Sequence, residues 1–285
     1  MINKLSLGTA NFNNNYGLEK NNLEFSYKHI KQILYYSQTS GIINIDTASN
    51  YTGVEKKLSV FNLSKFKISS KVPAIPVDCK NIEKFIFKKI YNSIKHLKIS
   101  SLENYFIHNP NDLITSKFKK KIYLSLVLAK RKKLIKRIGV SVYSLKELRK
   151  IIKNYKIDVV QLPLSLFDRR FLKIIHKLKK KKIIVQARSI FLQGLLLREI
   201  KNIPKNFSKF KEFKKFDNWI NKNNISRLEA CVNFLKSNSF VNSYIVGFNN
   251  LSQLKEIIEL FKVKKKNFFP KIFSKNLKLI DPRKW

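Results

Sequence analysis

Cysteine is scarce in this chain of 285 residues. The two that it has, Cys79 and Cys231, lie far apart in the sequence, which argues against a disulfide framework and a cysteine-based metal motif. We therefore expect a reducing compartment, the cytoplasm. No apolar run reaches the roughly 18 residues of a membrane-spanning helix. The N-terminal stretch MINKLSLGTA also lacks the apolar core of a secretory signal.

Acidic residues are also few: 18 Asp and Glu stand against 59 Lys and Arg, which gives a formal net charge of +41. Such an excess suggests a nucleic acid or an anionic membrane as partner. The basic clusters argue otherwise, because they are spaced along the chain near the ends of amphipathic segments, at 119–121, 130–133, 179–182 and 264–266. We interpret them as solvated helix faces and expect no specific nucleic-acid partner, with a polyanion-binding surface as the alternative.

A glycine-rich G-x-G-x-x-G turn is missing after the early apolar runs, which weighs against a Rossmann domain. Short apolar runs instead alternate with amphipathic segments along the chain. We expect strands at 4–7, 42–45, 66–70, 104–107, 137–140, 158–161, 182–185 and 243–246. We expect helices at 23–38, 53–60, 81–97, 116–131, 145–154, 168–180, 226–236 and 251–261.

Eight such units without a linker predict an α/β fold, the (β/α)8 TIM barrel, as one domain over residues 1–285. The stretch 190–222 contains aromatic residues without a clean period, and we expect an excursion over the barrel mouth there. A C-terminal tail is expected from about residue 263.

Four chemically active side chains follow three neighbouring predicted strands. Asp46 ends the second, Tyr51 lies on the loop behind it, Lys71 ends the third and His108 follows the fourth. Each has an ordinary alternative when taken alone: a helix-capping acid, a packing tyrosine, a surface lysine and a loop histidine. Because the active sites of such barrels lie at the carboxyl ends of the strands, their joint placement favours a reaction centre.

The four side chains suit one reaction. A phenol has a pKa of about 10, too high for efficient proton exchange near neutrality. An ammonium roughly 4 Å away interacts by about 4 kcal/mol at an effective dielectric constant near 20, so we expect Lys71 to lower the pKa of Tyr51. Asp46 would hold Lys71, and a neutral His108 would orient a substrate oxygen. This set suits protonation of a carbonyl oxygen while hydride arrives from a nicotinamide.

The settings of these residues, NIDTASNY, SSKVP and YFIHNP, resemble the catalytic tetrad of the aldo-keto reductases. LSLGTANF resembles the first strand and turn of that family, IGVSVYS its fifth strand, VVQLPLSLFDRR its sixth, and IVGFNNLSQLKEI its last strand and helix. ARSIFLQGLLL resembles the seventh-strand segment of a bacterial branch. The resemblance implies a monomeric NAD(P)H-dependent carbonyl reductase without metal or flavin, with Tyr51 as general acid.

The same resemblance implies which residues hold the cofactor. Two of them, Ser141 and Gln161, would contact the nicotinamide carboxamide. The full set is Thr9 in the first turn, Ser141, Gln161 and Arg188 at strand ends, Ser189, Leu192 and Gly194 near the pyrophosphate, and Gly247, Gln253 and Glu256 near the adenosine.

The sequence departs from the family pattern in three places. Val142 stands where many members have an asparagine, so one carboxamide contact is missing. Arg188 stands where many members stack an aromatic ring on the nicotinamide, and a guanidinium plane can stack in its place. Gly247 and Gln253 replace the Lys and Arg that grip a 2′-phosphate. The family favours NADPH, and NADH is the alternative.

The residues that line the substrate pocket are the hardest to predict from the sequence. Phe12, Tyr16 and Asn109 are candidates to line it, and so are the segment after Gly194 and the aromatic residues Phe268, Phe269 and Trp285; surface packing is the alternative. A mixed polar and aromatic mouth suits a small polar aldehyde, ketone or sugar derivative. Two other functions fit the same resemblance: a cofactor-binding regulatory protein, as potassium-channel β-subunits are, and an aldose dehydrogenase working in the oxidative direction.

Overall fold

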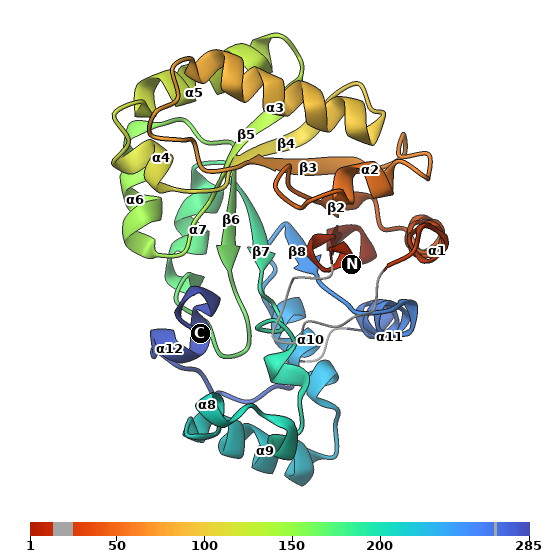
Figure 1. Ribbon diagram of the computed structural model, residues 1–285. Coiled ribbons are helices and arrows are strands. Elements are labelled where there is room, and N and C mark those ends of the chain that lie inside the picture. The colour runs from red at the N-terminus through yellow and green to blue at the C-terminus, as the bar shows by residue number, and fades with distance from the viewer. Residues whose placement is uncertain (14–24, 265–266) are drawn as a thin grey trace.

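Eight parallel strands close into a barrel (Figure 1). The computed structural model describes residues 1–13, 25–264 and 267–285. The strands pair in chain order, and the last pairs with the first. They are β1 (Leu5–Gly8), β2 (Asn44–Asp46), β3 (Lys67–Val72), β4 (Leu102–Ile107), β5 (Ile135–Ser141), β6 (Val159–Pro163), β7 (Ile184–Arg188) and β8 (Ser243–Val246). The predicted (β/α)8 barrel is confirmed.

The strands are buried because helices cover them from outside and side chains fill the barrel inside. Every residue of β4 and β6 is buried, as expected of parallel strands covered on both faces. The covering helices are α1 (Tyr27–Thr39), α2 (Val54–Leu58), α3 (Ile82–Leu97), α5 (Lys119–Arg131), α6 (Leu145–Asn154), α7 (Leu172–Lys180), α10 (Arg227–Ser237) and α11 (Leu251–Lys262).

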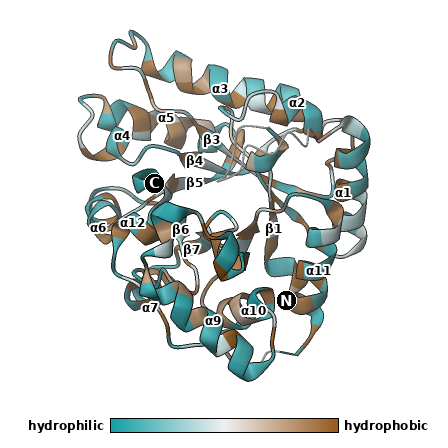
Figure 2. Ribbon diagram, turned by 60° about the horizontal axis from the view of Figure 1, so that its bottom comes forward, coloured by the Kyte–Doolittle hydropathy of each residue, from teal (hydrophilic) through white to brown (hydrophobic). Residues whose placement is uncertain are grey.

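The helices form where the sequence gives them an apolar stripe and a cap. Helix α3 buries Ile82, Ile86, Ile90 and Leu97 at helical spacing and leaves its lysines outside, so hydrophilic and hydrophobic residues alternate along it (Figure 2). Helix α6 begins at a capping box, in which the Ser144 hydroxyl and its partner three residues later each accept from the other's backbone N–H.

Two helix predictions need correction. A short helix, α4 (Asn111–Ile114), precedes α5 and was not expected, because four residues are too few to show a period. The helix expected from residue 168 begins at Leu172. Asp168 lies before it, fully buried, and its carboxylate accepts from the Arg170 guanidinium at 2.9 and 2.7 Å.

Between β7 and α10 the chain forms η3 (Leu195–Leu197), η4 (Ile200–Asn202), α8 (Lys205–Ser208) and α9 (Lys211–Asn223). The C-terminal segment forms α12 (Leu277–Ile280) and η5 (Pro282–Lys284). It lies on the same side of the barrel as α8, and the Trp285 ring packs on Phe207 of that helix with centroids 5.0 Å apart (Figure 1). Two short turns, η1 (Ile2–Lys4) and η2 (Ala10–Phe12), flank β1.

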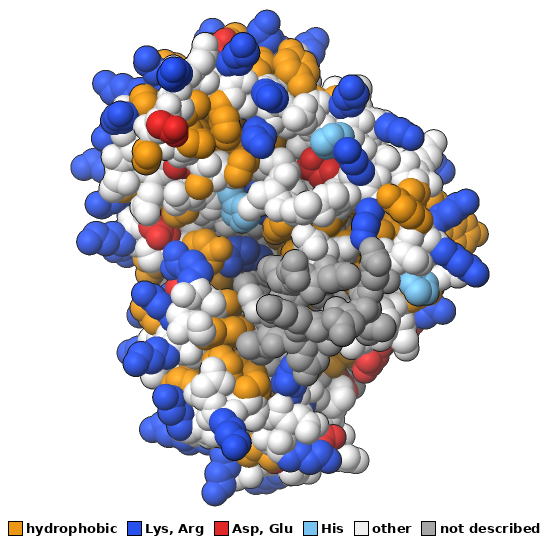
Figure 3. Space-filling model, in the orientation of Figure 1, with side chains coloured by type: hydrophobic (Ala, Val, Ile, Leu, Met, Phe, Trp, Pro, Cys, Tyr) orange, Lys and Arg blue, Asp and Glu red, His pale blue; other side chains and the backbone are white. Residues whose placement is uncertain are grey.

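Cationic side chains are spread over the face of the molecule shown in Figure 3. Lys and Arg are spread over the visible face and are not gathered in one patch, with few acidic residues between them (Figure 3). Among the described helices, none is both long and apolar enough to cross a bilayer.

Gly139 of β5 lies opposite Phe106 of β4 and has no room for a side chain. A Cβ there would lie 2.4 Å from Cδ1 of Phe106 and 2.9 Å from Cγ1 of Val159. We predict that Gly139→Ala lowers the free energy of unfolding by about 1–3 kcal/mol, measured by urea denaturation. Gly247→Ala is the control, because a Cβ there meets only Asn11 atoms at 3.9 Å. Equal stability of the two variants would contradict this account.

Candidate active site

A cavity of about 690 Å³ lies at the carboxyl ends of the strands. Each strand contributes at least one lining residue near or just past its carboxyl end, and these include Gly8, Asp46, Lys71, His108, Ser141, Gln161, Arg188 and Gly247. Tyr51, on the loop after β2, also lines it. The barrel therefore brings together the four residues that the sequence singled out.

An ion pair closes the floor of this cavity. Lys71 Nζ lies 2.6 Å from Asp46 Oδ2 and donates a second hydrogen bond to the Thr47 carbonyl at 2.8 Å. Both charged side chains are almost fully buried, with 2% and 7% exposed. Gln161 Nε2 donates to the other Asp46 oxygen at 2.8 Å. Side chains from β2, β3 and β6 thus hold one another across the barrel.

Tyr51 and His108 face each other edge to face, with ring centroids 6.4 Å apart and planes at 80°. Lys71 Nζ lies 5.4 Å from the centroid of the Tyr51 ring. Burial, followed by the Asp46 carboxylate, nevertheless raises the pKa of Tyr51 above its ordinary value. The net lowering of this pKa that the sequence analysis expected is not found, because desolvation is the largest influence and the Asp46 carboxylate opposes the lysine charge. Tyr51 is a protonated phenol at neutral pH.

The imidazole of His108 is neutral. Burial, with the charges of Lys71 and Arg188, lowers its pKa to about 3. An imidazole that stays neutral at pH 7 can donate one hydrogen bond and accept another. This agrees with the neutral histidine that the sequence analysis predicts at this position.

The turn after β7 offers unused backbone donors. Ser189, Leu192, Gln193 and Gly194 have positive φ values of 55°, 47°, 52° and 84°. In the part of the chain that the structure describes, the amides of Gln193 and Gly194 bond to no backbone carbonyl. Successive N–H groups in such conformations form concave anion sites. Ser189, Gln193 and Gly194 line the cavity. Leu192, which was also predicted near the pyrophosphate, does not, because its side chain is fully buried and its N–H donates to the Ser189 carbonyl at 2.9 Å.

A second cavity of about 640 Å³ adjoins the first. The two share Leu197, Gly247 and Gln253 in their linings. Glu256 of α11 lines the second cavity. The predicted adenosine-end residues therefore lie at the junction and in the outer chamber, away from Tyr51. In the residues outside the gaps, no group of His, Cys, Asp or Glu side chains is arranged to hold a metal ion.

Several predicted site residues lie elsewhere. Thr9 is buried, and its hydroxyl donates to the Asp46 carbonyl at 3.1 Å, so it supports the site from behind. Phe12 is fully buried against Phe25, with ring centroids 4.8 Å apart. Asn109 accepts from a backbone N–H of α4 and does not line the cavity. Tyr16 lies outside the described residues.

The C-terminal aromatic residues Phe268, Phe269 and Trp285 pack on other aromatic rings and line neither cavity. The cavity lining also holds Asn11, Tyr143, Gln193 and Asn249, which the sequence analysis missed. Arg198 and Asn202 line it too, and they lie in the predicted segment after Gly194. The signal for Tyr143 was present, because it stands two residues after Ser141. Tyr143 lies just past the end of β5, where the loops that follow the strands reach the cavity.

The ion pair is open to a direct test. Lys71→Met would leave the Asp46 carboxylate buried without its cation, and we predict a loss of about 3–5 kcal/mol in the free energy of unfolding. The double variant Asp46→Asn, Lys71→Met should lose less than the sum of the two single variants, because no uncompensated charge remains. Urea denaturation of all four proteins measures the coupling. Additive losses would contradict an energetically coupled pair.

Comparison with known proteins agrees with this geometry. The chain has the fold of the aldo-keto reductase AKR11C1 from Bacillus halodurans, with 15% identity, a TM-score of 0.74 and 94% of each chain covered. It also has the fold of the glycerol dehydrogenase AKR11B4 from Gluconobacter oxydans, with 19% identity, a TM-score of 0.67 and coverage of 90% of this chain and 86% of the other. No curated protein sequence matches the chain. The model of the aldo/keto reductase family matches residues 4–275, so the chain belongs to that family.

Proposed function

We propose that the protein is an NAD(P)H-dependent reductase that converts an aldehyde or ketone to an alcohol, with Tyr51 as proton donor. One observation carries the proposal: a protonated, half-buried Tyr51 shares a cavity with a neutral His108 and the Lys71–Asp46 ion pair. Family membership supports the general reaction, since aldo-keto reductases reduce carbonyl compounds with NAD(P)H.

The residues present suit a nicotinamide dinucleotide. The two adjoining cavities give room for a long ligand with two ends. The free amides of Gln193 and Gly194 suit its phosphates. Ser141 can donate a hydroxyl to a carboxamide. The amide nitrogen of Gln161 donates hydrogen bonds to Asp46 and Gln186, which leaves the amide carbonyl oxygen free to accept one.

When bound, the reduced nicotinamide supplies a hydride to the carbonyl carbon. Tyr51 gives its phenolic proton to the carbonyl oxygen, which yields the alcohol and a phenolate that solvent reprotonates. His108 donates a hydrogen bond to the same oxygen and orients it. Two N–H groups of Lys71 are held by Asp46 and Thr47. The third can stabilise the phenolate as it forms, which supports Tyr51 only while charge develops.

The protonated form of Tyr51 is the form from which carbonyl reduction starts. A reductase needs the phenol protonated before the step, and burial keeps it so at neutral pH. A dehydrogenase working in the oxidative direction would need the phenolate as base before the step, and that form is scarce here. A regulatory protein that binds the cofactor without turnover would have the same residues. The Tyr51 experiment below distinguishes it from an enzyme.

The lining supports a small polar substrate. Amide side chains of Asn11, Gln193, Asn202 and Asn249 share the first cavity with the Arg198 guanidinium. Such groups hydrogen-bond hydroxyl-bearing molecules, so we favour a polar aldehyde, ketone or sugar derivative. A monomeric, cytoplasmic enzyme stays our prediction.

The first test removes the proton donor. Tyr51→Phe should lower kcat for carbonyl reduction at least about a hundredfold, because general acid catalysis typically contributes 10²–10⁴-fold. Oxidation of NADPH by a panel of polar aldehydes, followed by absorbance, measures it. Binding of NADPH should be nearly unchanged, since the ring is retained. Full activity of Tyr51→Phe, or no turnover by the wild-type protein with any substrate, would contradict the proposal.

The second test concerns cofactor preference. The second cavity contains Lys201 and Arg227, which can meet a 2′-phosphate although each is paired with an acid, Glu199 and Asp217 respectively. We predict that NADPH binds about tenfold more tightly than NADH, a difference of about 1.4 kcal/mol, measured by titration calorimetry. Lys201→Gln should weaken NADPH binding and leave NADH binding nearly unchanged. Equal or tighter binding of NADH would overturn the NADPH preference.

A further inference from the structure

Arg188, the last residue of β7, has a fixed position and an unpaired charge. Its Nη2 donates to the Val142 carbonyl at 3.1 Å, and its Nη1 lies 3.4 Å from the Ser189 hydroxyl. Both acceptors are neutral. Its Nε is buried without an acceptor, and no carboxylate of the described chain forms an ion pair with it. The side chain nevertheless lines the cavity beside the four predicted catalytic residues.

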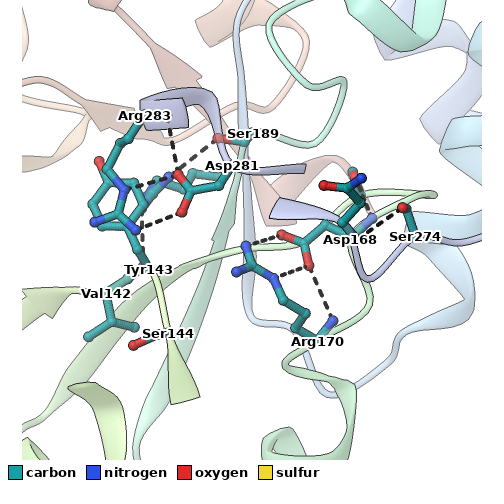
Figure 4. Close-up of polar contacts among 12 residues, drawn as sticks. Val142, Tyr143, Ser144, Asp168, Arg170, Ser189, Ser274, Asp281 and Arg283 are labelled. Carbon is teal, nitrogen blue, oxygen red and sulfur yellow. Dashed lines mark hydrogen bonds and ion pairs between the residues drawn. The ribbon is translucent and has the colours of Figure 1, made fainter. Parts of the chain in front are cut away.

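A three-layer stack fixes the plane of this guanidinium. Arg188 Cζ lies 3.9 Å from the centroid of the Tyr143 ring, and Arg283 Cζ lies 3.6 Å from the same centroid. Two guanidinium groups this close to one ring cannot share a face, so the ring lies between them. Figure 4 shows Arg283 beside Tyr143. Arginine stacks favourably on aromatic faces, so Arg188 is held flat at the edge of the cavity.

The two ends of the stack differ in charge. Arg283 is neutralised by Asp281, which accepts from its Nε at 2.9 Å and from its Nη2 at 2.6 Å (Figure 4). That carboxylate is only 2% exposed. Arg188 has no such partner. The stack therefore presents an uncompensated positive charge on its cavity side and none at its other end.

The field of Arg188 reaches the predicted reaction centre. Its charge lowers the pKa of both Tyr51 and His108, although burial is the largest influence on each. A hydride donor must touch the carbonyl carbon, and Tyr51 and His108 must touch its oxygen. A nicotinamide ring in position to react therefore lies within the same field.

We infer that Arg188 makes this cavity bind the reduced nicotinamide cofactor more tightly than the oxidised one. The inference rests on the proposed function. The reduced ring is neutral and the oxidised ring carries one positive charge, so the guanidinium repels only the oxidised form. Loss of the hydride would place a new cation beside Arg188, and the spent cofactor would leave more readily than the reduced cofactor.

The experiment compares binding of NADPH and NADP⁺ without any carbonyl substrate, by titration calorimetry. In Arg188→Gln, the ratio of the NADP⁺ to the NADPH dissociation constant should fall about tenfold from its wild-type value, the effect of about one pK unit of charge interaction. Arg188→Met is a second neutral variant in case the first fails to fold. Arg188→Lys keeps the charge and should stay within about threefold of the wild-type ratio.

Arg198→Gln is the matched control, since Arg198 lines the same cavity. Any contact it makes with phosphates is equal in the two redox forms, so the ratio should stay unchanged. A ratio unaltered in both neutral variants, or altered equally in Arg188→Lys, would overturn the inference alone. A fall in affinity for a carboxylate-bearing carbonyl, with the ratio unchanged, would assign Arg188 to the substrate and also overturn it. If the wild-type protein bound neither form, the proposed function itself would be contradicted.

Discussion

The buried ion pair between Lys71 and Asp46 is the interaction on which the site depends. Each charge would be costly to bury alone, and the pair is tolerated because the Thr47 carbonyl and the Gln161 amide satisfy its remaining hydrogen-bonding groups. These contacts join β2, β3 and β6, three strands that do not all neighbour one another in the barrel. The positions of Tyr51 and His108 at the rim follow from that fixed floor.

Burial, more than charge, sets the chemistry of the two rim residues. A phenol close to an ammonium would ordinarily become more acidic, and the sequence suggested this outcome. In the folded protein the ammonium is already neutralised, and exclusion of water controls both Tyr51 and His108. Both stay uncharged at neutral pH. The site is a half-buried cavity with one protonated donor and one neutral hydrogen-bonding ring, in which electrostatic stabilisation develops as a negative charge forms.

The sequence predicted the barrel well because each strand is a short buried run and each helix has an apolar stripe. Residues at strand ends, such as Ser141, Gln161 and Arg188, could also be placed, since the barrel sends all these ends to one rim. Contacts made by connecting segments could not. Phe12 is an aromatic residue near the first strand end, as a pocket residue would be, but it packs inside. Asn109 turns back and accepts a hydrogen bond from the Asn111 N–H.

The stack around Tyr143 shows most clearly what could not be predicted from the sequence. Arg283 lies 140 positions along the chain from that ring, in a tail whose sequence shows no period. Nothing local distinguishes Arg283 from the many other cationic residues. Its role depends on the path by which the C-terminal segment returns to the barrel, and on Asp281 two residues before it. Only tertiary structure separates this arginine from a solvated one.

The spread of lysine and arginine over the surface has a consequence for the kinetics of association. A molecule with a net charge of +41 attracts phosphate-bearing ligands from every direction, and the four predicted catalytic residues add no net repulsion because their charges cancel. Encounter with a dinucleotide would therefore be accelerated at low ionic strength and slowed as salt screens the attraction over about 10 Å at 0.1 M. A surface with no single binding patch can thus still influence how fast the cavity is filled.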